Sequence, residues 1–158
     1  MKSKWIVVAA LGTGLLLFAA GAAAQSYNPV RWFKKGPTAS EQLTTNRDEG
    51  KKLSSQLQAI LPAKMSLVDA CAGFRELRDC VAALHVSHNL KIRFNCLKWD
   101  VTGVQPTVGG VASCRAPESG KAVSLVKAIE TFRPDANART EAKNAERRAQ
   151  EDIKDARS

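Results

Sequence analysis

Residues 66–89, in the middle of the chain, carry the clearest helical pattern of hydrophobic and polar positions. Their apolar side chains recur at intervals of three and four, and at about 100° per residue they fall on one stripe. The stripe consists of Leu67, Ala70, Cys71, Phe74, Leu77, Val81 and Leu84. Ser66 is suited to cap the first turn, Asp69 lies near the positive helix end, and Asn89 tolerates the left-handed conformation that ends a helix. We therefore predict one continuous helix over residues 66–89.

Two weaker helical patterns flank this segment. Residues 40–61 place leucine and isoleucine at mostly helical spacings, Gly50 weakens the middle, and Pro62 ends the pattern. Residues 121–132 form a second amphipathic pattern, which Pro134 breaks. Both segments are predicted to be helices of the same core.

The segment that follows residue 89 allows two interpretations. Residues 90–96 alternate apolar and polar side chains, as a half-buried strand does. The same region also fits a short helix that Asn95 caps and Gly103 ends, and we favour this helix. Residues 105–120 are rich in glycine and proline and are predicted to form a loop.

The end of the chain, residues 137–157, is almost entirely alanine and charged residues. One thin apolar seam runs along it, formed by Ala138, Ala142, Ala145, Ala149, Ile153 and Ala156. Ion pairs four residues apart are expected for Asp135 with Arg139, Arg147 with Glu151, and Arg148 with Asp152. We predict a long, solvated and mostly independent helix, because alanine buries little area. Docking of the seam on a protein partner, or self-association through it, is the second interpretation.

The first 24 residues have the three parts of a secretory signal peptide. Lys2 and Lys4 precede an uncharged apolar stretch, which ends in the small residues 21–24. Cleavage is expected after Ala24, which places the protein in the periplasm or outside the cell. The alternative is an uncleaved N-terminal membrane anchor. The predicted organisation is a signal peptide at 1–24, a linker at 25–37, a helical domain at 38–134 and a charged helix at 135–158.

Basic residues outnumber acidic ones, 24 to 15, which gives a formal net charge of +9. Removal of Lys2 and Lys4 with the signal peptide lowers this charge to +7. The whole excess precedes residue 135, since the C-terminal segment has equal numbers of both signs. Such a surface attracts an anionic membrane surface or an envelope polymer. Nucleic acid is not expected as a partner outside the cytoplasm.

The linker at 25–37 is the strongest candidate for a binding site. It combines aromatic and basic side chains, a composition typical of adsorption at a membrane interface. The predicted surface-binding residues are Arg31, Trp32, Phe33, Lys34 and Lys35. The competing interpretation is that the aromatic side chains fold back onto the helical core.

Four cysteines follow the signal segment, and an even number in an exported chain indicates two disulfides. Within a continuous helix, Cys71 and Cys80 would stand about 13 Å apart along the axis. A disulfide needs Cα atoms within about 7 Å, so this pair is excluded if the helix is continuous. We predict the nested pairs Cys80–Cys96 and Cys71–Cys114, because a chain that turns back near Leu90 brings residues 80 and 96 together.

His85 and His88 are the two histidines of the chain, three residues apart on the predicted central helix. Two imidazoles on one helix can bind zinc, copper or the edge of a haem. A spacing of four is more usual for a helical metal pair, however, and no carboxylate is adjacent in sequence. We interpret both as histidines at the boundary of the core. Metal or haem binding through His85 and His88 is the alternative function, and no cofactor is predicted.

No catalytic motif is present: the chain lacks a nucleophile elbow, a phosphate-binding loop, HExxH and CxxC. Adjacent carboxylates such as Asp48 with Glu49 lie in charged stretches where no tuning of their pKa is expected. An enzyme is therefore not favoured. The leading prediction is a non-enzymatic envelope or secreted protein that interacts with an anionic surface or another protein.

Residues 83–90 (ALHVSHNL), together with residues 94–98 (FNCLK), resemble a group of small exported helical bacterial proteins without an assigned activity. The similarity extends to the signal peptide, the helical centre and the charged alanine-rich end. It implies an all-helical fold and no particular function. The predicted fold is all-α: a small helical domain crosslinked by disulfides, with a charged alanine-rich C-terminal helix.

Overall fold

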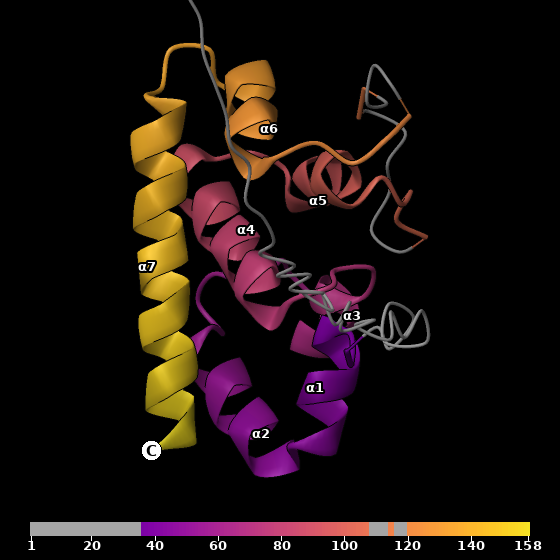
Figure 1. Cartoon of the computed structure of the whole chain (residues 1–158), viewed down its shortest axis with the longest axis vertical. Helices are drawn as coiled ribbons and strands as arrows, with labels where there is room; N and C mark the ends of the chain where they lie inside the picture. Colours follow the sequence, from indigo (N-terminus) through magenta and orange to yellow (C-terminus); the bar gives the residue numbers. More distant parts are fainter. Residues whose placement is uncertain (1–35, 108–113, 116–119) are drawn as a thin grey trace, which may run out of the picture. The chain divides into compact units, whose positions relative to one another are not determined.

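The computed structural model describes residues 36–107, 114–115 and 120–158. Within these ranges the chain forms seven helices and no strand, so the all-α prediction is confirmed (Figure 1). The described residues belong to one compact unit. The helices are α1 (Ala39–Thr45), α2 (Arg47–Gln56), α3 (Leu67–Cys71), α4 (Leu77–Leu90), α5 (Phe94–Thr102), α6 (Leu125–Phe132) and α7 (Ala138–Arg157).

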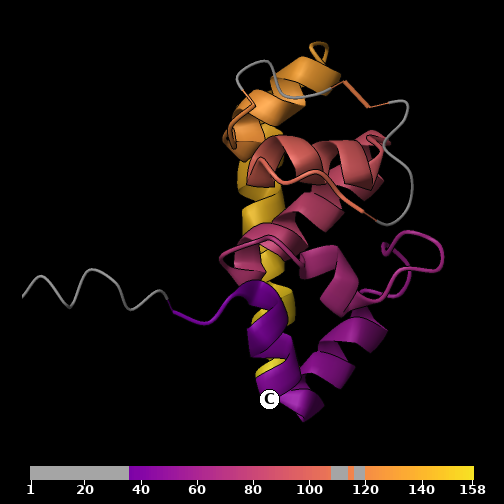
Figure 2. The same cartoon turned by 90° about the vertical axis from the view of Figure 1, so that its right-hand side faces the viewer.

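Helix α4 is the centre of the core. It packs against α7 along one side and also contacts α1, α3 and α5. Figures 1 and 2 show α1 and α2 at one end of this arrangement and α5 and α6 at the other. Half of the residues of α4 are buried: Leu77, Cys80, Val81, Ala82, Ala83, Leu84 and Val86.

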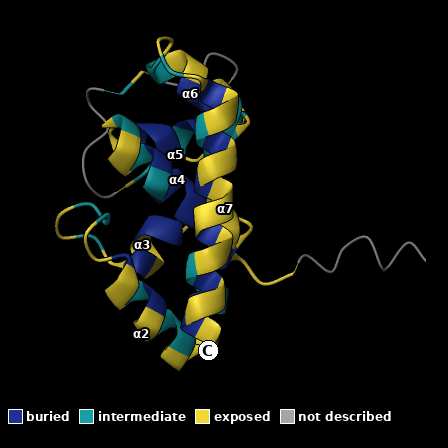
Figure 3. Cartoon of the chain, turned by 90° about the vertical axis from the view of Figure 1, so that its left-hand side faces the viewer, coloured by how far each residue is buried: buried dark blue, intermediate teal, exposed yellow. Residues whose placement is uncertain are grey.

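Helix α7 buries its apolar seam against other helices, which corrects the prediction of a mostly independent helix, while its opposite face is solvated as expected. All six seam residues are buried, and Ala149 has no exposed surface. Figure 3 shows buried positions recurring along α7 between exposed ones. The helix packs against α2, α4 and α6. Small alanine side chains allow two helix backbones to approach closely, so a seam that is poor in area still forms a long interface.

The continuous helix predicted over residues 66–89 is wrong, because the chain breaks after Cys71. Gly73 has φ +92°, a left-handed conformation that glycine adopts readily, and α4 begins only at Leu77. The predicted cap is confirmed: the Ser66 hydroxyl accepts a hydrogen bond from the Asp69 backbone N–H at 3.1 Å. The predicted stripe is still buried, since α3 and α4 both turn it towards the core.

The same break corrects the disulfide pairing. Cys71 bonds to Cys80, with Cα atoms 5.3 Å apart, and Cys96 bonds to Cys114, with Cα atoms 5.1 Å apart. The nested pairs Cys80–Cys96 and Cys71–Cys114 were predicted on the assumption of a continuous helix. The bend at Gly73 removes that assumption, because it returns the chain so that residue 80 meets residue 71. Two disulfides are typical of an oxidising compartment.

Residues 40–61 also form two helices where one was predicted. The chain bends at Asn46, and α2 folds against α1. A Cβ atom added to Gly50 would lie 2.6 Å from the Leu43 carbonyl oxygen. Gly50 is therefore a point of close approach between the two helices, where the sequence had indicated only a weakness in one helix.

The remaining helices agree more closely with the sequence. The segment after residue 89 forms the helix α5, and Gly103 ends it with φ +69°, as predicted. The predicted cap Asn95 is wrong, because the helix begins at Phe94 and its N-cap is Arg93. Helix α6 begins at Leu125, four residues later than the pattern suggested, and Ser124 is its cap. Helix α4 ends at Leu90 with Lys91 in the left-handed conformation, two positions beyond Asn89. No helix in the described ranges has the length and apolarity needed to cross a membrane.

Candidate functional site

A groove of about 350 Å³ lies between the α1–α2 pair and the start of α3. Its apolar lining residues are Leu43, Leu67 and Val68; the two leucines are buried in the core, so Val68 is the one that is exposed. Val68 is 38% exposed, and among the described residues it is one of two large hydrophobic side chains that are exposed. The volume is in the range of ordinary small-molecule sites. The groove therefore offers apolar surface that the fold itself does not cover.

The polar side of this groove carries positive charge. Arg47 and Lys51 line it one turn apart on α2, and none of the described residues that line it is acidic. Within the described part of the chain, neither cation has an ion pair or a side-chain hydrogen bond. The neighbouring carboxylate Glu49 is held instead by Arg157 of α7, at 2.8 Å. Two free cations beside an apolar surface favour an anion with an apolar part.

Three hydroxyl groups also line the groove. The Thr44 hydroxyl donates to the Glu41 carbonyl oxygen. The Ser66 hydroxyl donates to the Asp69 carboxylate and accepts from the Asp69 backbone N–H. Ser54 has no side-chain hydrogen bond to another described residue. Its hydroxyl is thus available beside Lys51 to donate to a ligand oxygen.

Two contacts determine the shape of the groove. The close approach at Gly50 sets the distance between α1 and α2. The Cys71–Cys80 bond fixes the end of α3, three residues beyond Val68. Sequence patterns did not indicate the groove, because it needs a bend within residues 40–61 and another after Cys71.

The two histidines have different surroundings. His85 Nε2 lies 2.6 Å from Asp152 Oδ2, and the exposed fractions of the two side chains are 12% and 28%. Asp152 was expected to pair with Arg148, and no carboxylate was expected beside the histidines; tertiary packing of α7 on α4 explains both differences. His88 is exposed, so it is not a boundary histidine of the core. The described ranges contain no cluster of three or more histidine, cysteine or acidic side chains that could bind a metal.

A larger cavity, of about 500 Å³, lies among α4, α5, α6 and α7. Its charged lining is mixed: Arg75 faces it together with the carboxylates of Asp79 and Glu146. Burial raises the pKa of Asp79, and the nearby carboxylates of Glu76 and Glu146 raise it further. Opposite charges compensate each other here, so this cavity favours neither an anionic nor a cationic ligand.

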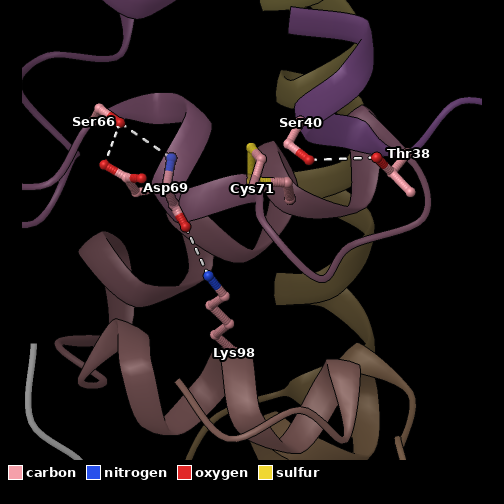
Figure 4. The surroundings of a disulfide bond; sticks show 7 residues. Thr38, Ser40, Ser66, Asp69, Cys71 and Lys98 are labelled. Carbon is pink, nitrogen blue, oxygen red and sulfur yellow. Dashed lines mark hydrogen bonds between the residues drawn. A yellow bond between two sulfur atoms is a disulfide. The ribbon is translucent and has the colours of Figure 1, made fainter. Parts of the chain in front are cut away.

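Lys98 is a buried cation that the sequence did not reveal. It is 7% exposed, and its Nζ donates to the Asp69 carbonyl oxygen at 2.8 Å (Figure 4). Burial lowers the pKa of Lys98, while the Asp69 carboxylate acts in the opposite direction. Lysine is rarely buried, so a lysine on the polar side of a helical pattern gave no reason to expect this position.

The predicted binding residues of the linker, Arg31, Trp32, Phe33, Lys34 and Lys35, lie outside the described residues. So does the predicted signal peptide. Among the described residues, the groove on α1, α2 and α3 is therefore the candidate binding site. No family model, no curated protein and no solved structure matches this chain.

Proposed function

We propose that this chain is an exported, non-enzymatic protein that binds anionic lipid at a membrane surface. Arg47 and Lys51 would contact the anionic headgroup, and Leu43, Leu67 and Val68 would receive the start of the acyl chain. One observation carries the proposal: among the described residues, the groove combines the exposed Val68 with two cations that have no ion pair and with no acidic side chain.

The expected affinity is modest. A basic residue near an anionic membrane contributes about 1 kcal/mol, and each buried methylene group about 0.8 kcal/mol. The net charge of +7 expected for the processed chain adds a long-range attraction that salt screens. The predicted linker residues Trp32 and Phe33, with the adjacent cations, would provide a second contact with the same surface.

The other functions considered have less support. In the metal or haem alternative, His85 and His88 would both turn to one ligand, but His85 Nε2 is already hydrogen-bonded to Asp152. In the protein-partner alternative, the alanine seam of α7 would be the docking surface, but α2, α4 and α6 cover that seam. Neither alternative uses the groove.

Co-sedimentation with lipid vesicles tests the proposal. Vesicles of phosphatidylglycerol and of phosphatidylcholine would be compared for the chain that begins at Gln25. We expect binding to the anionic vesicles only, and release as salt is raised. Val68→Asp should abolish most of this binding, because it places a negative charge within the groove. A variant that lacks residues 25–37 should bind more weakly but should keep its sensitivity to Val68→Asp.

Two results would count against the groove. Equal binding to both kinds of vesicle would show that Arg47 and Lys51 do not contribute to binding. Unchanged binding by Val68→Asp, together with complete loss in the variant without residues 25–37, would assign the whole activity to the linker.

A further inference from the structure

Lys98 connects two parts of the core that are distant in sequence. It projects from α5 to α3, where its Nζ donates to the Asp69 carbonyl oxygen (Figure 4). The Cys71–Cys80 bond, two residues beyond Asp69, holds this end of α3 in place. In the described part of the chain, Lys98 and Asp100 are the charged residues that are buried. The Lys98 side chain is thus held against α3 and is largely shielded from bulk water.

A cavity of about 220 Å³ lies beside this amine. Lys98 and Asp69 line it together with Met65, Val104, Pro106 and Thr107. Its size suits a molecule of a few carbon atoms, and its lining is partly apolar and partly polar. The cavity is separate from the groove, since no residue lines both.

The hydrogen bonding of Lys98 leaves its nitrogen free to react. An ammonium group has three donors, and among the described residues only the Asp69 carbonyl accepts from it. Burial lowers the pKa of Lys98, which raises the fraction of neutral amine at a given pH, while the Asp69 carboxylate acts in the opposite direction. A neutral amine still donates to the Asp69 carbonyl and also carries a lone pair. Buried lysines with these properties are the nucleophiles of Schiff-base chemistry.

We propose that the cavity beside Lys98 takes up small aldehydes and that the Nζ of Lys98 condenses with them to form a reversible imine. The nitrogen attacks the carbonyl carbon, and a C=N bond replaces the C=O bond. The carbonyl oxygen leaves as water and takes both hydrogens of the amine, so no oxidant or reductant is needed. Hydrolysis reverses the step. The site would bind carbonyl compounds independently of lipid binding in the groove.

Reductive trapping on the intact chain tests this proposal. The protein is incubated with propanal and cyanoborohydride at neutral pH, which converts each imine to a stable propylamine. Peptide mapping then gives the rate of modification at Lys98 and at the exposed lysines Lys52 and Lys143. We expect Lys98 to react several-fold faster than either, and to lose this preference in denaturant. Modification of Lys98 at the same rate as the exposed lysines, or more slowly, would overturn the proposal.

Two variants locate the reaction. Lys98→Arg keeps the charge and a donor for the Asp69 carbonyl but cannot form the imine, so the fast adduct should disappear. Val104→Trp places bulk in the cavity from an exposed position and should slow modification of Lys98 several-fold, with Lys52 unchanged. Rapid modification of Lys98 in this variant would contradict entry through the cavity. The mapping of the unmodified chain remains decisive if either variant fails to fold.

Discussion

His85 on α4 and Asp152 on α7 are joined by a hydrogen bond of 2.6 Å between Nε2 and Oδ2, although 67 residues separate them. The pair lies at the longest helix interface of the core, where both side chains are largely shielded from water. It ties the charged C-terminal helix to the centre of the fold. A partly buried charge-assisted hydrogen bond is worth more than an exposed ion pair.

A double-mutant cycle measures this connection. His85→Gln and Asp152→Asn should each lower the free energy of unfolding by about 1–2 kcal/mol. The double variant should lose clearly less than the sum, because both changes remove one shared interaction. His88→Gln is the matched control and should stay within about 0.5 kcal/mol, since His88 is exposed. Additive effects of the two substitutions in chemical denaturation would show that the residues are not coupled.

The disulfide pattern is open to direct mapping. Proteolysis without reduction should release one peptide pair joined through Cys71 and Cys80 and another through Cys96 and Cys114. Replacement of Cys71 and Cys80 by alanine should cost about 2–4 kcal/mol of stability. Recovery of peptides that join Cys80 to Cys96 would contradict the fold around Gly73.

Local signals in the sequence predicted much of the secondary structure. The cap at Ser66, the glycine end at Gly103 and the seam of α7 depend on neighbouring residues, and all three are present. The ion pair expected between Arg147 and Glu151 also forms, at 2.9 Å. These features depend only on the geometry of a single helix, so the spacing of residues along the sequence predicts them.

Features that depend on distant contacts were not predictable in the same way. Gly73 is only a weak local signal of a bend, because it lies within an unbroken apolar periodicity and a helix tolerates a single glycine. Asp152 could pair equally well with Arg148 on its own helix, and only the packing of α7 selects His85. The groove and the burial of Lys98 likewise follow from how helices meet, which spacing does not express.

The buried seam of α7 gives a sharp prediction. Ala149→Asp should reduce stability by about 3 kcal/mol or more, because it places an unpaired charge in a fully buried position. Asn144→Asp adds the same charge to the exposed face of α7 and should change stability by no more than about 0.5 kcal/mol. Thermal or chemical denaturation of both variants makes the comparison. Similar stabilities would mean that α7 does not pack on α4.

Gly50 provides a test whose sign is informative. In an isolated helix, glycine to alanine stabilises by up to about 1 kcal/mol. Here the added Cβ would meet the Leu43 carbonyl oxygen at 2.6 Å, so Gly50→Ala should destabilise by about 1–3 kcal/mol. Gly36→Ala serves as the control, because no atom lies within 4 Å of its added Cβ. A gain in stability from Gly50→Ala would contradict the close contact of α1 with α2 at Gly50.

Binding of anionic vesicles by two charge-matched double variants tests the central claim most directly. One variant, Arg47→Gln with Lys51→Gln, removes the cations of the groove. The other, Lys52→Gln with Lys143→Gln, removes the same charge from exposed positions outside it. We predict that the first loses about 2 kcal/mol of binding to phosphatidylglycerol vesicles, roughly thirtyfold in affinity, and that the second loses several-fold less. Equal losses in both variants would show that net charge alone drives binding and would contradict a lipid site in the groove.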